Sequence, residues 1–439
     1  MDIINRLEQM PVSRFHYKLL LMAGMGWLFD AMDTGIIAFV LPVLMAKWQL
    51  TAAQAGLLGS IGLLGMAVGA IVSGILADRI GRKNVFAVTM LVYSLATGLC
   101  AAANSFEVLV VLRFFVGFGL GGELPVAATL VAEYCPAEKR GWFMVLLESF
   151  WGFGWLAAAL VAYFVIPVYG WQMAFVVGAL PALYVVVIRF STPESVRYLL
   201  DKGRIEEAHS IVCAIEQSAG LEPVKEVSLP PIREEEKITL RQLWTGRFIR
   251  RTVMLWLLWF GIVYSYYGIF TWLPTLLVGQ GFTVLKSFEY VLIMTLAQLP
   301  GYFSAAYLVD KWGRKSTLAL YLAMSAVCAY CFGQGGTALS VLVWGSLMAF
   351  FNLGAWGVVY TYTPEQYPTA IRASGSGWAA AVGRCGGMLA PIVVGCMLGG
   401  PGGFTQVFVM FAAVLLGISV VVGLLGKETK GKALDLISE

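Results

Sequence analysis

The chain has 439 residues, of which 59% are hydrophobic and only 13% are charged. Soluble domains average about 25% charged residues, so this composition excludes an ordinary soluble protein. The formal net charge of +4 follows the distribution of basic residues between membrane spans, and it does not indicate nucleic-acid binding. We therefore expect an all-α membrane protein.

Apolar stretches of 18 or more residues with few charges predict membrane-spanning helices. Six such stretches precede a long polar insert, and six follow it. We therefore predict an N-terminal six-helix bundle (1–190), a cytoplasmic linker with short helices (191–250, one of them over 203–217), and a C-terminal six-helix bundle with a cytoplasmic tail (251–439). The twelve predicted transmembrane helices are 18–46, 54–77, 85–104, 107–134, 141–166, 171–190, 252–277, 286–309, 316–334, 338–362, 371–398 and 404–425.

The distribution of Lys and Arg predicts the orientation of these spans. If both termini are cytoplasmic, only Lys47 and Lys286 lie outside. Arg113 and Arg384 then fall inside the membrane, and all other Lys and Arg face the cytoplasm. This bias is typical of a multi-pass protein of the cell inner (plasma) membrane, which we expect to act in the lipid bilayer as a monomer.

The two halves repeat the same charged motifs at a fixed spacing. The motif at 78–83, Asp-Arg-Ile-Gly-Arg-Lys, returns 232 residues later at 310–315 as Asp-Lys-Trp-Gly-Arg-Lys. Internal repeats indicate duplication, and duplicated halves are typical of transporters. The two bundles are therefore expected to be pseudo-symmetric. A second pair repeats at the same offset: Glu133 with Arg140, and Glu365 with Arg372.

These motifs resemble those of the major facilitator superfamily. Gly74-x-x-x-Asp78-Arg79-x-Gly81-Arg82-Lys83 is similar to the superfamily's loop between helices 2 and 3, and Arg113-x-x-x-Gly117-x-Gly119 is similar to its helix 4 motif. The resemblance covers nearly the whole chain and implies two six-helix bundles that rock about a central site. Two further motifs resemble the sugar-porter-like branch: Pro193-Glu194-Ser195-x-Arg197 and Pro364-Glu365-x-Tyr367-Pro368-Thr369-x-x-Arg372.

Within that branch, three segments resemble bacterial niacin transporters and their relatives, the organic-ion transporters and synaptic-vesicle glycoproteins. These segments are Phe29-Asp30-x-x-Asp33, Gly121-Gly122-Glu123-Leu124-Pro125 and Pro364-Glu365-x-Tyr367-Pro368-Thr369. True sugar porters carry a paired-Gln motif in helix 7, whereas this chain reads Gly261-x-x-Tyr264-x-Tyr266-Tyr267-Gly268 there. That difference argues against a sugar as the substrate.

Charged residues in the middle of a span are functional candidates, because each costs roughly 2.5–3.5 kcal/mol on insertion scales. Asp30 and Asp33 lie near the middle of the first span, three residues apart, and share one helical face. Two such carboxylates repel, so one of them should hold a proton near neutral pH. We predict a proton-coupling site of Asp30, Asp33, Glu123 and Arg113. The alternative is a structural network in which the Arg neutralises the acids.

Arg384 lies in the middle of the eleventh span, and its repeat-equivalent position is Gly152. The charge is therefore specific to one half. A guanidinium is always protonated and offers a planar fork that matches a carboxylate. Arg384 is thus predicted to bind an organic anion. Alternatively, it only neutralises one of the buried acids.

Aromatic and amide side chains occur at helical spacing on helices 7, 8 and 10. The resemblance implies that helices 1, 4, 7 and 10 surround the central site, although such a stripe is also common in a core or against lipid. Aromatic faces with one cation and a few amides suit a flat aromatic acid better than a sugar. The predicted substrate-binding residues are Arg384, Trp259, Tyr264, Tyr267, Gln298, Asn352, Trp356 and Tyr360.

The repeated charges near the cytoplasmic ends of the helices have a different predicted role. The resemblance implies inter-helix salt bridges that hold the outward-open state and break when the inside opens. Topogenic charge alone explains the Lys and Arg but leaves the matched acids unexplained. The predicted gating residues are Asp78, Arg82, Glu133, Arg140, Glu194, Arg197, Asp310, Arg314, Glu365 and Arg372.

The expected function is secondary active import of a small aromatic carboxylate, nicotinate, by proton symport with alternating access. Two alternatives remain open: a transporter of organic cations or other aromatic acids, and a non-transporting membrane binding protein. We expect no enzyme activity and no cofactor, because the sequence lacks His-Glu-x-x-His, a mid-helix Gly-x-Ser-x-Gly and a phosphate loop. The seven cysteines show no spacing typical of a metal or disulfide framework.

Overall fold

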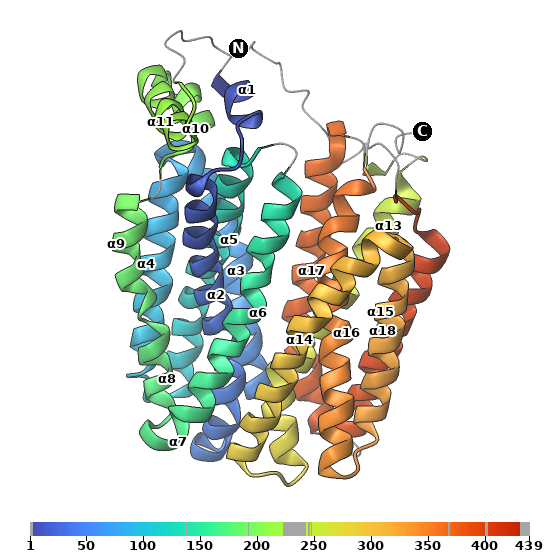
Figure 1. Ribbon diagram of the computed structural model, residues 1–439. Coiled ribbons are helices and arrows are strands. Elements are labelled where there is room, and N and C mark those ends of the chain that lie inside the picture. Colours follow the sequence, from blue (N-terminus) through green and yellow to red (C-terminus); the bar gives the residue numbers. More distant parts are fainter. Residues whose placement is uncertain are drawn as a thin grey trace. The chain divides into compact units, whose positions relative to one another are not determined.

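The computed structural model describes residues 3–136, 139–191, 193–222, 243–244, 246, 248–367, 369–399 and 403–430. The regular secondary structure within these ranges is helical (Figure 1). The helices are α1 (Ile3–Glu8), α2 (Arg14–Trp48), α3 (Ala52–Ile80), α4 (Arg82–Cys100), α5 (Phe106–Tyr134), α6 (Arg140–Phe164), α7 (Ile166–Tyr169), α8 (Trp171–Gly178), α9 (Pro181–Ser191), α10 (Val196–Asp201), α11 (Ile205–Ser218), α13 (Ile249–Gly279), α14 (Val284–Trp312), α15 (Arg314–Gly333), α16 (Ala338–Glu365), α17 (Thr369–Leu398) and α18 (Gly403–Leu425).

The chain forms two compact units. Unit 1 comprises Met1–Thr34, Leu64–Ala157 and Tyr169–Glu235. Unit 2 comprises Gly35–Leu63, Ala158–Val168 and Glu236–Glu439. Helices α2, α3 and α6 are thus each divided between the two units. The expected division of the chain into 1–190, 191–250 and 251–439 stays a prediction.

Twelve helical segments in the described ranges are long and apolar enough to cross a membrane, which confirms the predicted number of spans. The sixth segment, Trp171–Ile188, consists of two helices rather than one. Helix α8 ends at Gly178 and α9 begins at Pro181. Proline has no N–H to donate and is suited to the first position of a helix, so the interruption falls directly before it.

Helix α4 shows how an apolar span divides its faces. Leu91, Leu95 and Leu99 are 39%, 62% and 58% exposed, whereas Met90 and Tyr93 are fully buried. Residues four apart lie on one side of a helix, so the leucines form a continuous apolar stripe. A stripe of this kind is stable only against an apolar solvent, which is the lipid of a bilayer.

The internal repeat is preserved in helix packing. A Cβ added to Gly69 would lie 1.9 Å from the carbonyl oxygen of Phe118, and one added to Gly301 would lie 2.1 Å from that of Phe350. Both residues of the second contact lie 232 positions after their counterparts in the first. Only glycine allows backbones to approach so closely, and the repeat therefore confirms pseudo-symmetric bundles. A further contact repeats at the same offset. A Cβ at Gly154 would lie 2.3 Å from the Leu28 carbonyl oxygen, and one at Gly386 would lie 2.5 Å from that of Phe260.

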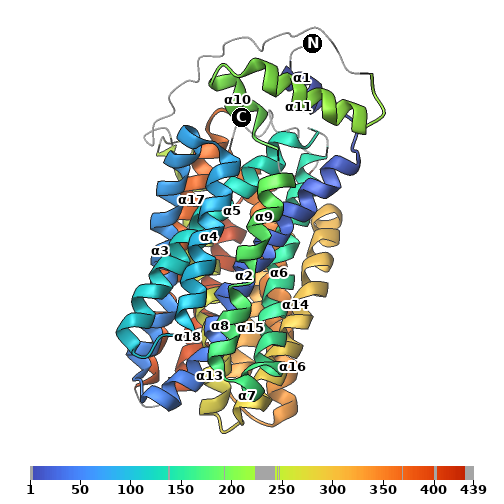
Figure 2. The same ribbon diagram turned by 90° about the vertical axis from the view of Figure 1, so that its left-hand side faces the viewer.

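The N-terminal helix α1, which the sequence did not predict, is fastened to α11. Arg6 donates from Nε and Nη2 to the two carboxylate oxygens of Glu216, at 2.8 and 2.6 Å. Both side chains are buried, and this hydrogen bonding raises the pKa of Arg6 above its ordinary value. In Figure 2, α11 lies across the direction of the long helices, with α1 beside it. The short helix expected over 203–217 is thus confirmed as α11.

Candidate functional site

Asp33 of unit 1 is fully buried and has a complete set of partners. The Thr97 hydroxyl donates to Oδ1 at 2.8 Å, and Arg113 Nη1 donates to Oδ2 at 3.0 Å. The side chains of Asp33 and Arg113 are 0% and 4% exposed. A buried ion pair is costly to break, since the remaining charge is then uncompensated. For Asp33, the structure thus shows the structural pairing with Arg113.

Asp30 and Glu123 form a second acidic site in the same unit. They are 0% and 1% exposed, and their carboxyl groups lie close enough to act on each other electrostatically. No other group among the described residues donates a hydrogen bond to either carboxyl. A carboxylate only accepts hydrogen bonds, so such a pair is satisfied when it shares one proton. The sequence indicated that Asp30 and Asp33 act on each other and grouped Glu123 with them, and the structure places Glu123 beside Asp30 and pairs Asp33 with Arg113.

A glycine on α2 makes room for this acidic pair. A Cβ at Gly26 would lie 2.4 Å from Glu123 Oε1, so any other residue would displace the carboxyl group. Gly26 lies one helical turn before Asp30, on the same face. The sequence reasoning missed Gly26. A glycine four residues from a mid-span acid was the available signal.

Arg384 lies on a part of α17 that packs against α13 through glycines. A Cβ at Gly383 would lie 3.1 Å from the Trp259 carbonyl oxygen, and one at Gly387 would lie 3.2 Å from the Tyr267 ring. The half-buried Arg384 guanidinium acts electrostatically on the Tyr267 hydroxyl. Among the described residues of unit 2, none accepts a hydrogen bond from Arg384 or forms an ion pair with it. Its charge is therefore available to a ligand.

Trp259, Trp356 and Tyr360 form an aromatic cluster between α13 and α16. The ring centroids of Trp259 lie 6.4 Å from Trp356 and 5.1 Å from Tyr360. Trp259 Nε1 donates to the Thr363 hydroxyl at 2.9 Å, which fixes the indole. Tyr266 adds a fourth ring, 5.0 Å from Trp356. Apart from Tyr267, four aromatic residues were predicted to bind substrate on helices 7 and 10. The structure brings three of them together: Trp259, Trp356 and Tyr360.

Tyr264 points to a different neighbour. Its ring stacks on Phe260 at 5.9 Å and tilts against Phe411 at 5.8 Å. Its hydroxyl lies 3.2 Å from the sulfur of Met410 on α18. The structure therefore does not place Tyr264 in the aromatic cluster, because on α13 it lies on the side that packs against α18.

Two buried amides in unit 2 have no hydrogen-bond partner among the described residues. Gln298 of α14 and Asn352 of α16 are both 0% exposed. Neither side-chain oxygen nor nitrogen has a hydrogen-bond partner among the described residues. Buried polar groups are almost always hydrogen-bonded, so each exception needs an explanation. Gln298 and Asn352 thus give unit 2 two buried amides whose hydrogen-bonding capacity is unused within the described structure.

The first polar cluster at a helix end caps α4. The Glu194 carboxylate accepts hydrogen bonds from the backbone N–H groups of Arg82 and Lys83, at 3.0 and 3.2 Å. An anion at a helix N-terminus satisfies free N–H groups and complements the helix dipole. The Arg82 guanidinium contacts Glu133 and donates to the Ser195 hydroxyl at 2.8 Å. Arg82, Glu133 and Glu194 thus lie together, as the sequence predicts for gating residues of one bundle.

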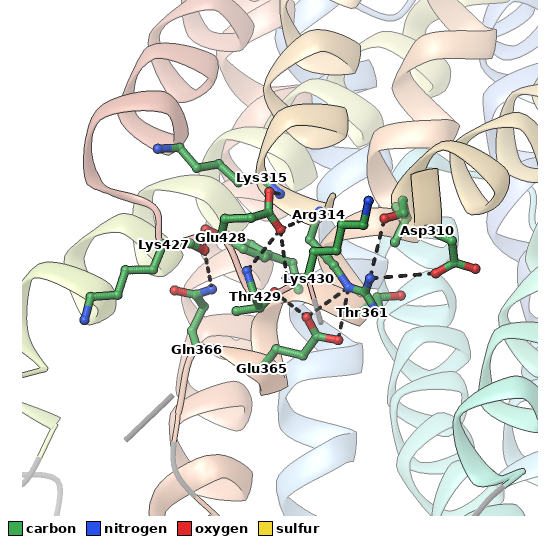
Figure 3. Close-up of polar contacts among 12 residues, drawn as sticks. Asp310, Arg314, Lys315, Thr361, Glu365, Gln366, Lys427, Glu428, Thr429 and Lys430 are labelled. Carbon is green, nitrogen blue, oxygen red and sulfur yellow. Dashed lines mark hydrogen bonds and ion pairs between the residues drawn. The ribbon is translucent and has the colours of Figure 1, made fainter. Parts of the chain in front are cut away.

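The second cluster repeats this arrangement in unit 2 (Figure 3). Glu428 accepts from the backbone N–H groups of Arg314 and Lys315, at 2.9 and 3.1 Å, and so caps α15. Arg314 Nε lies 3.2 Å from Glu365, and the Thr429 hydroxyl donates to Glu365 at 2.5 Å. The predicted gating residue Asp310 is 3.7 Å from Arg314 Nη1 and is largely exposed.

The remaining predicted gating residues lie outside these clusters. Arg140 and Arg197 each lie 3.5 Å from Glu8 of α1, a partner that the sequence did not indicate. Arg372 Nε donates to the backbone carbonyls of Pro364 and Tyr367, at 3.0 and 3.3 Å. The side chain of Asp78 lies outside the described part of the structure.

Residues 19–439 match the model for sugar (and other) transporters. The chain belongs to this family. The assignment confirms the predicted class, a multi-pass membrane transporter of small molecules rather than an enzyme, and it agrees with the helical architecture and the internal repeat.

Individual relatives are similar over their full length. The chain is 59% identical over 437 residues to the "Niacin transporter NiaP" of Acinetobacter baylyi (strain ATCC 33305 / BD413 / ADP1), covering 100% of both chains. It is 47% identical over 429 residues to the "Putative niacin/nicotinamide transporter NiaP" of Bacillus subtilis (strain 168), covering 98% of this transporter and 100% of that one. These similarities confirm the resemblance to bacterial niacin transporters.

Solved structures show the same fold. The partially occluded, inward-open xylose transporter XylE from E. coli superposes with a TM-score of 0.77 at 18% identity, covering 96% of this chain and 100% of XylE. Similarity at this low identity concerns the fold alone, and it confirms the predicted major facilitator architecture.

Proposed function

We propose that this transporter imports nicotinate by proton symport with alternating access. The observation that carries the proposal is Arg384, a half-buried guanidinium on a membrane-spanning helix with no anionic partner among the described residues of its unit. A cation in that position is costly unless an anion compensates it. The printed names of both bacterial relatives, as niacin transporters, support a pyridine carboxylate as that anion.

In this proposal the substrate carboxylate lies on the Arg384 fork, which matches two carboxylate oxygens. The flat ring packs against the aromatic cluster of Trp259, Trp356 and Tyr360, with Tyr267 beside Arg384. The Thr363 hydroxyl holds the Trp259 indole, which pre-organises one wall of the site and reduces the entropy lost on binding. Tyr264 has a packing role instead, because it contacts α18.

The Asp30–Glu123 pair of unit 1 is the proposed proton site. One carboxyl group of the pair accepts a proton and then donates a hydrogen bond to the other, so proton binding removes a buried charge. Proton movement coupled to an anion also reduces the net charge carried across the membrane. Asp33 and Arg113 support this site structurally, since each compensates the other at 3.0 Å.

The repeated cap clusters are the proposed gating elements. Arg82–Glu133 and Arg314–Glu365 are partly buried ion pairs at helix ends, held by the capping acids Glu194 and Glu428. Contacts of this kind have two discrete arrangements, made and broken, and so provide a bistable element for alternating access. We further propose that the transporter acts as a monomer in the plasma membrane, with both termini and these clusters on the cytoplasmic side.

A second candidate function is the transport of organic cations. It is favoured by the acidic Asp30–Glu123 pair, which has no cationic partner among the described residues. A quaternary ammonium group would then replace the shared proton. Under this candidate, choline competes for binding, and nicotinate does not.

The test is uptake into proteoliposomes that contain only the purified transporter. With an inward proton gradient, nicotinate is expected to accumulate, faster at lower external pH, and a protonophore is expected to abolish accumulation. Nicotinamide keeps the ring and removes the charge, so it is expected to compete poorly. Uptake that ignores the proton gradient would refute symport. Equal competition by nicotinamide would refute the role of Arg384, and competition by choline alone would establish the second candidate.

A further inference from the structure

The two unpartnered amides of unit 2 are not explained by the contacts of Arg384 or by helix packing. Gln298 and Asn352 are fully buried, yet all four of their polar side-chain atoms lack a hydrogen-bond partner within the described structure. Leaving such groups unsatisfied is destabilising, whereas apolar side chains of similar shape would be neutral or better. Their presence therefore indicates a ligand that supplies the missing partners.

Asn352 and Arg384 lie on two helices, α16 and α17, that both contact the Trp259 side chain. Asn352 lies one helical turn before Trp356 on the same face of α16. The Trp356 ring lies 6.4 Å from that of Trp259. Trp259 in turn packs against Gly383, the residue before Arg384. The aromatic cluster is thus common to the helix that carries Asn352 and the helix that carries Arg384.

Gln298 is less directly connected. It lies one turn before Tyr302 on α14, and the Tyr302 ring packs on Gly357 of α16, where a Cβ would be only 2.8 Å away. Gln298 therefore faces the contact between α14 and α16. Of the two amides, Asn352 is the one that shares its helix face with Trp356 of the aromatic cluster.

A pyridine carboxylate offers two polar groups: the carboxylate, and a ring nitrogen that only accepts hydrogen bonds. An asparagine amide donates from Nδ2. We propose that Asn352 donates a hydrogen bond to the ring nitrogen and thereby makes the transporter prefer nicotinate over benzoate. The proposal rests on the proposed function, in which Arg384 holds the carboxylate.

Benzoate matches nicotinate in size, shape and charge but carries a C–H in place of the ring nitrogen. A site that is built around a hydrogen bond discriminates against an analogue that lacks it, because the protein group is left unpaired. For one neutral hydrogen bond, we expect nicotinate to bind roughly 10- to 100-fold more tightly than benzoate. Picolinate and isonicotinate carry the nitrogen at other ring positions, and their affinities are expected to fall towards that of benzoate.

The experiment measures the dissociation constants of nicotinate and benzoate by calorimetry on purified protein. Asn352→Leu is expected to weaken nicotinate binding by roughly 10- to 100-fold and to leave benzoate binding unchanged or tighter, so the preference disappears. The control is Ser325→Ala on α15, which removes another buried polar group of unit 2 that has no hydrogen-bond partner among the described residues, and it is expected to keep the preference. Equal weakening of both ligands by Asn352→Leu, or loss of the preference in Ser325→Ala, would overturn the assignment to Asn352.

The ligand series provides a test that needs no variant. Equal binding of nicotinate, picolinate, isonicotinate and benzoate to the unaltered protein would overturn this inference while leaving the proposed function intact. Binding of none of these carboxylates would instead refute the proposed function. In the Arg384→Ala variant, loss of both nicotinate and benzoate supports the carboxylate fork, on which the inference depends.

Discussion

The two units carry the same polar clusters at their helix ends and different charges in the middle of their helices. At the ends, Glu194 and Glu428 cap α4 and α15 with the same pair of backbone hydrogen bonds. In the middle, the repeat-equivalent positions of Asp30 and Glu123 are apolar, and that of Arg384 is a glycine: Ile262, Ala355 and Gly152.

This difference separates structural and gating contacts from those that bind ligand or proton. A contact found in both units serves something that both must do, such as capping a helix or changing partners during a cycle. A buried charge without a counter-charge that is found in one unit is not required by the architecture, because the other unit folds without it. The Asp33–Arg113 pair is also unrepeated, with Ser265 and Gly345 at the equivalent positions, but its two charges compensate each other and it is structural. Five predictions test this division.

The largest expected effect is the loss of nicotinate binding in Arg384→Ala, by at least about 100-fold, because a carboxylate loses a bidentate charged partner. Arg384→Lys is expected to restore little, since an ammonium cannot reproduce the planar fork. Affinity is measured by calorimetry, with thermal unfolding as a check on the fold. The control is Lys286→Ala, which removes an exposed cation of the same unit. Unaltered affinity in Arg384→Ala would contradict the division in its clearest case.

The second effect concerns the unpaired acids of unit 1. Asp30→Asn and Glu123→Gln each remove the shared proton site, so accumulation driven by a proton gradient is expected to disappear while nicotinate exchange across the membrane continues. Gly26→Ala should give the same result, since its Cβ would lie 2.4 Å from Glu123 Oε1. Accumulation and exchange are compared in the same proteoliposomes. Retained accumulation in all three variants would refute the Asp30–Glu123 site.

The third effect concerns stability. Arg113→Leu leaves Asp33 buried without its cation and is expected to cost about 3–5 kcal/mol of unfolding free energy. The double variant Arg113→Leu with Asp33→Leu removes both charges and is expected to recover most of that loss. Thermal unfolding in detergent measures both variants. A single variant as stable as the double one would show that the pair is not a structural element.

The repeat, the number of spans and the fold were predictable from the sequence, because long apolar stretches and repeated charges are local features. The cap glutamate of unit 1, Glu194, was also visible in its motif, Pro193-Glu194-Ser195-x-Arg197. The partners in the cap clusters were harder to predict. The hydroxyls of Ser195 and Thr429 donate hydrogen bonds to Glu133 and Glu365, respectively, and these contacts depend on tertiary structure.

The pairing of the buried acids was not predictable for the same reason. Asp30 and Asp33 are three residues apart and share a face, which suggested that they act on each other. Their observed neighbours lie on α4 and α5. The partners of Asp33 are Thr97 and Arg113, which follow it in the sequence by 64 and 80 residues. Sequence spacing specifies the face of a helix, but it does not specify which neighbour covers that face.

The fourth effect is smaller and should be equal in the two units. Gly81 and Gly313 have φ of 93° and 100° with extended ψ, a region that is essentially restricted to glycine. Gly81→Ala and Gly313→Ala are each expected to cost about 1–3 kcal/mol, with added crowding of Glu194 or Glu428. Gly74→Ala is the control, because a Cβ there meets nothing within 4 Å. Losses confined to one unit would show that the clusters are not equivalent.

The smallest expected effect is the change in nicotinate affinity when the gating clusters are altered. Glu133→Gln and Glu365→Gln remove a partly buried ion pair at a helix end, worth on the order of 1 kcal/mol. A change of that size shifts the populations of the two access states, and apparent affinity falls only by the fraction of protein in the competent state. Nicotinate affinity is therefore expected to change by a few-fold at most.

Transport is expected to suffer more than binding in these two variants, because each cycle passes through both access states and a bias towards one slows the return. Affinity and uptake are measured for both variants and for Glu289→Gln, which breaks the exposed pair with Lys286 and is expected to alter neither. The two gating variants should be similar, since Glu133 and Glu365 are repeat equivalents. A folded variant that lost all nicotinate binding would place the glutamate in the substrate site. It would contradict the assignment of gating to the repeated helix ends and of ligand binding to the unrepeated helix centres.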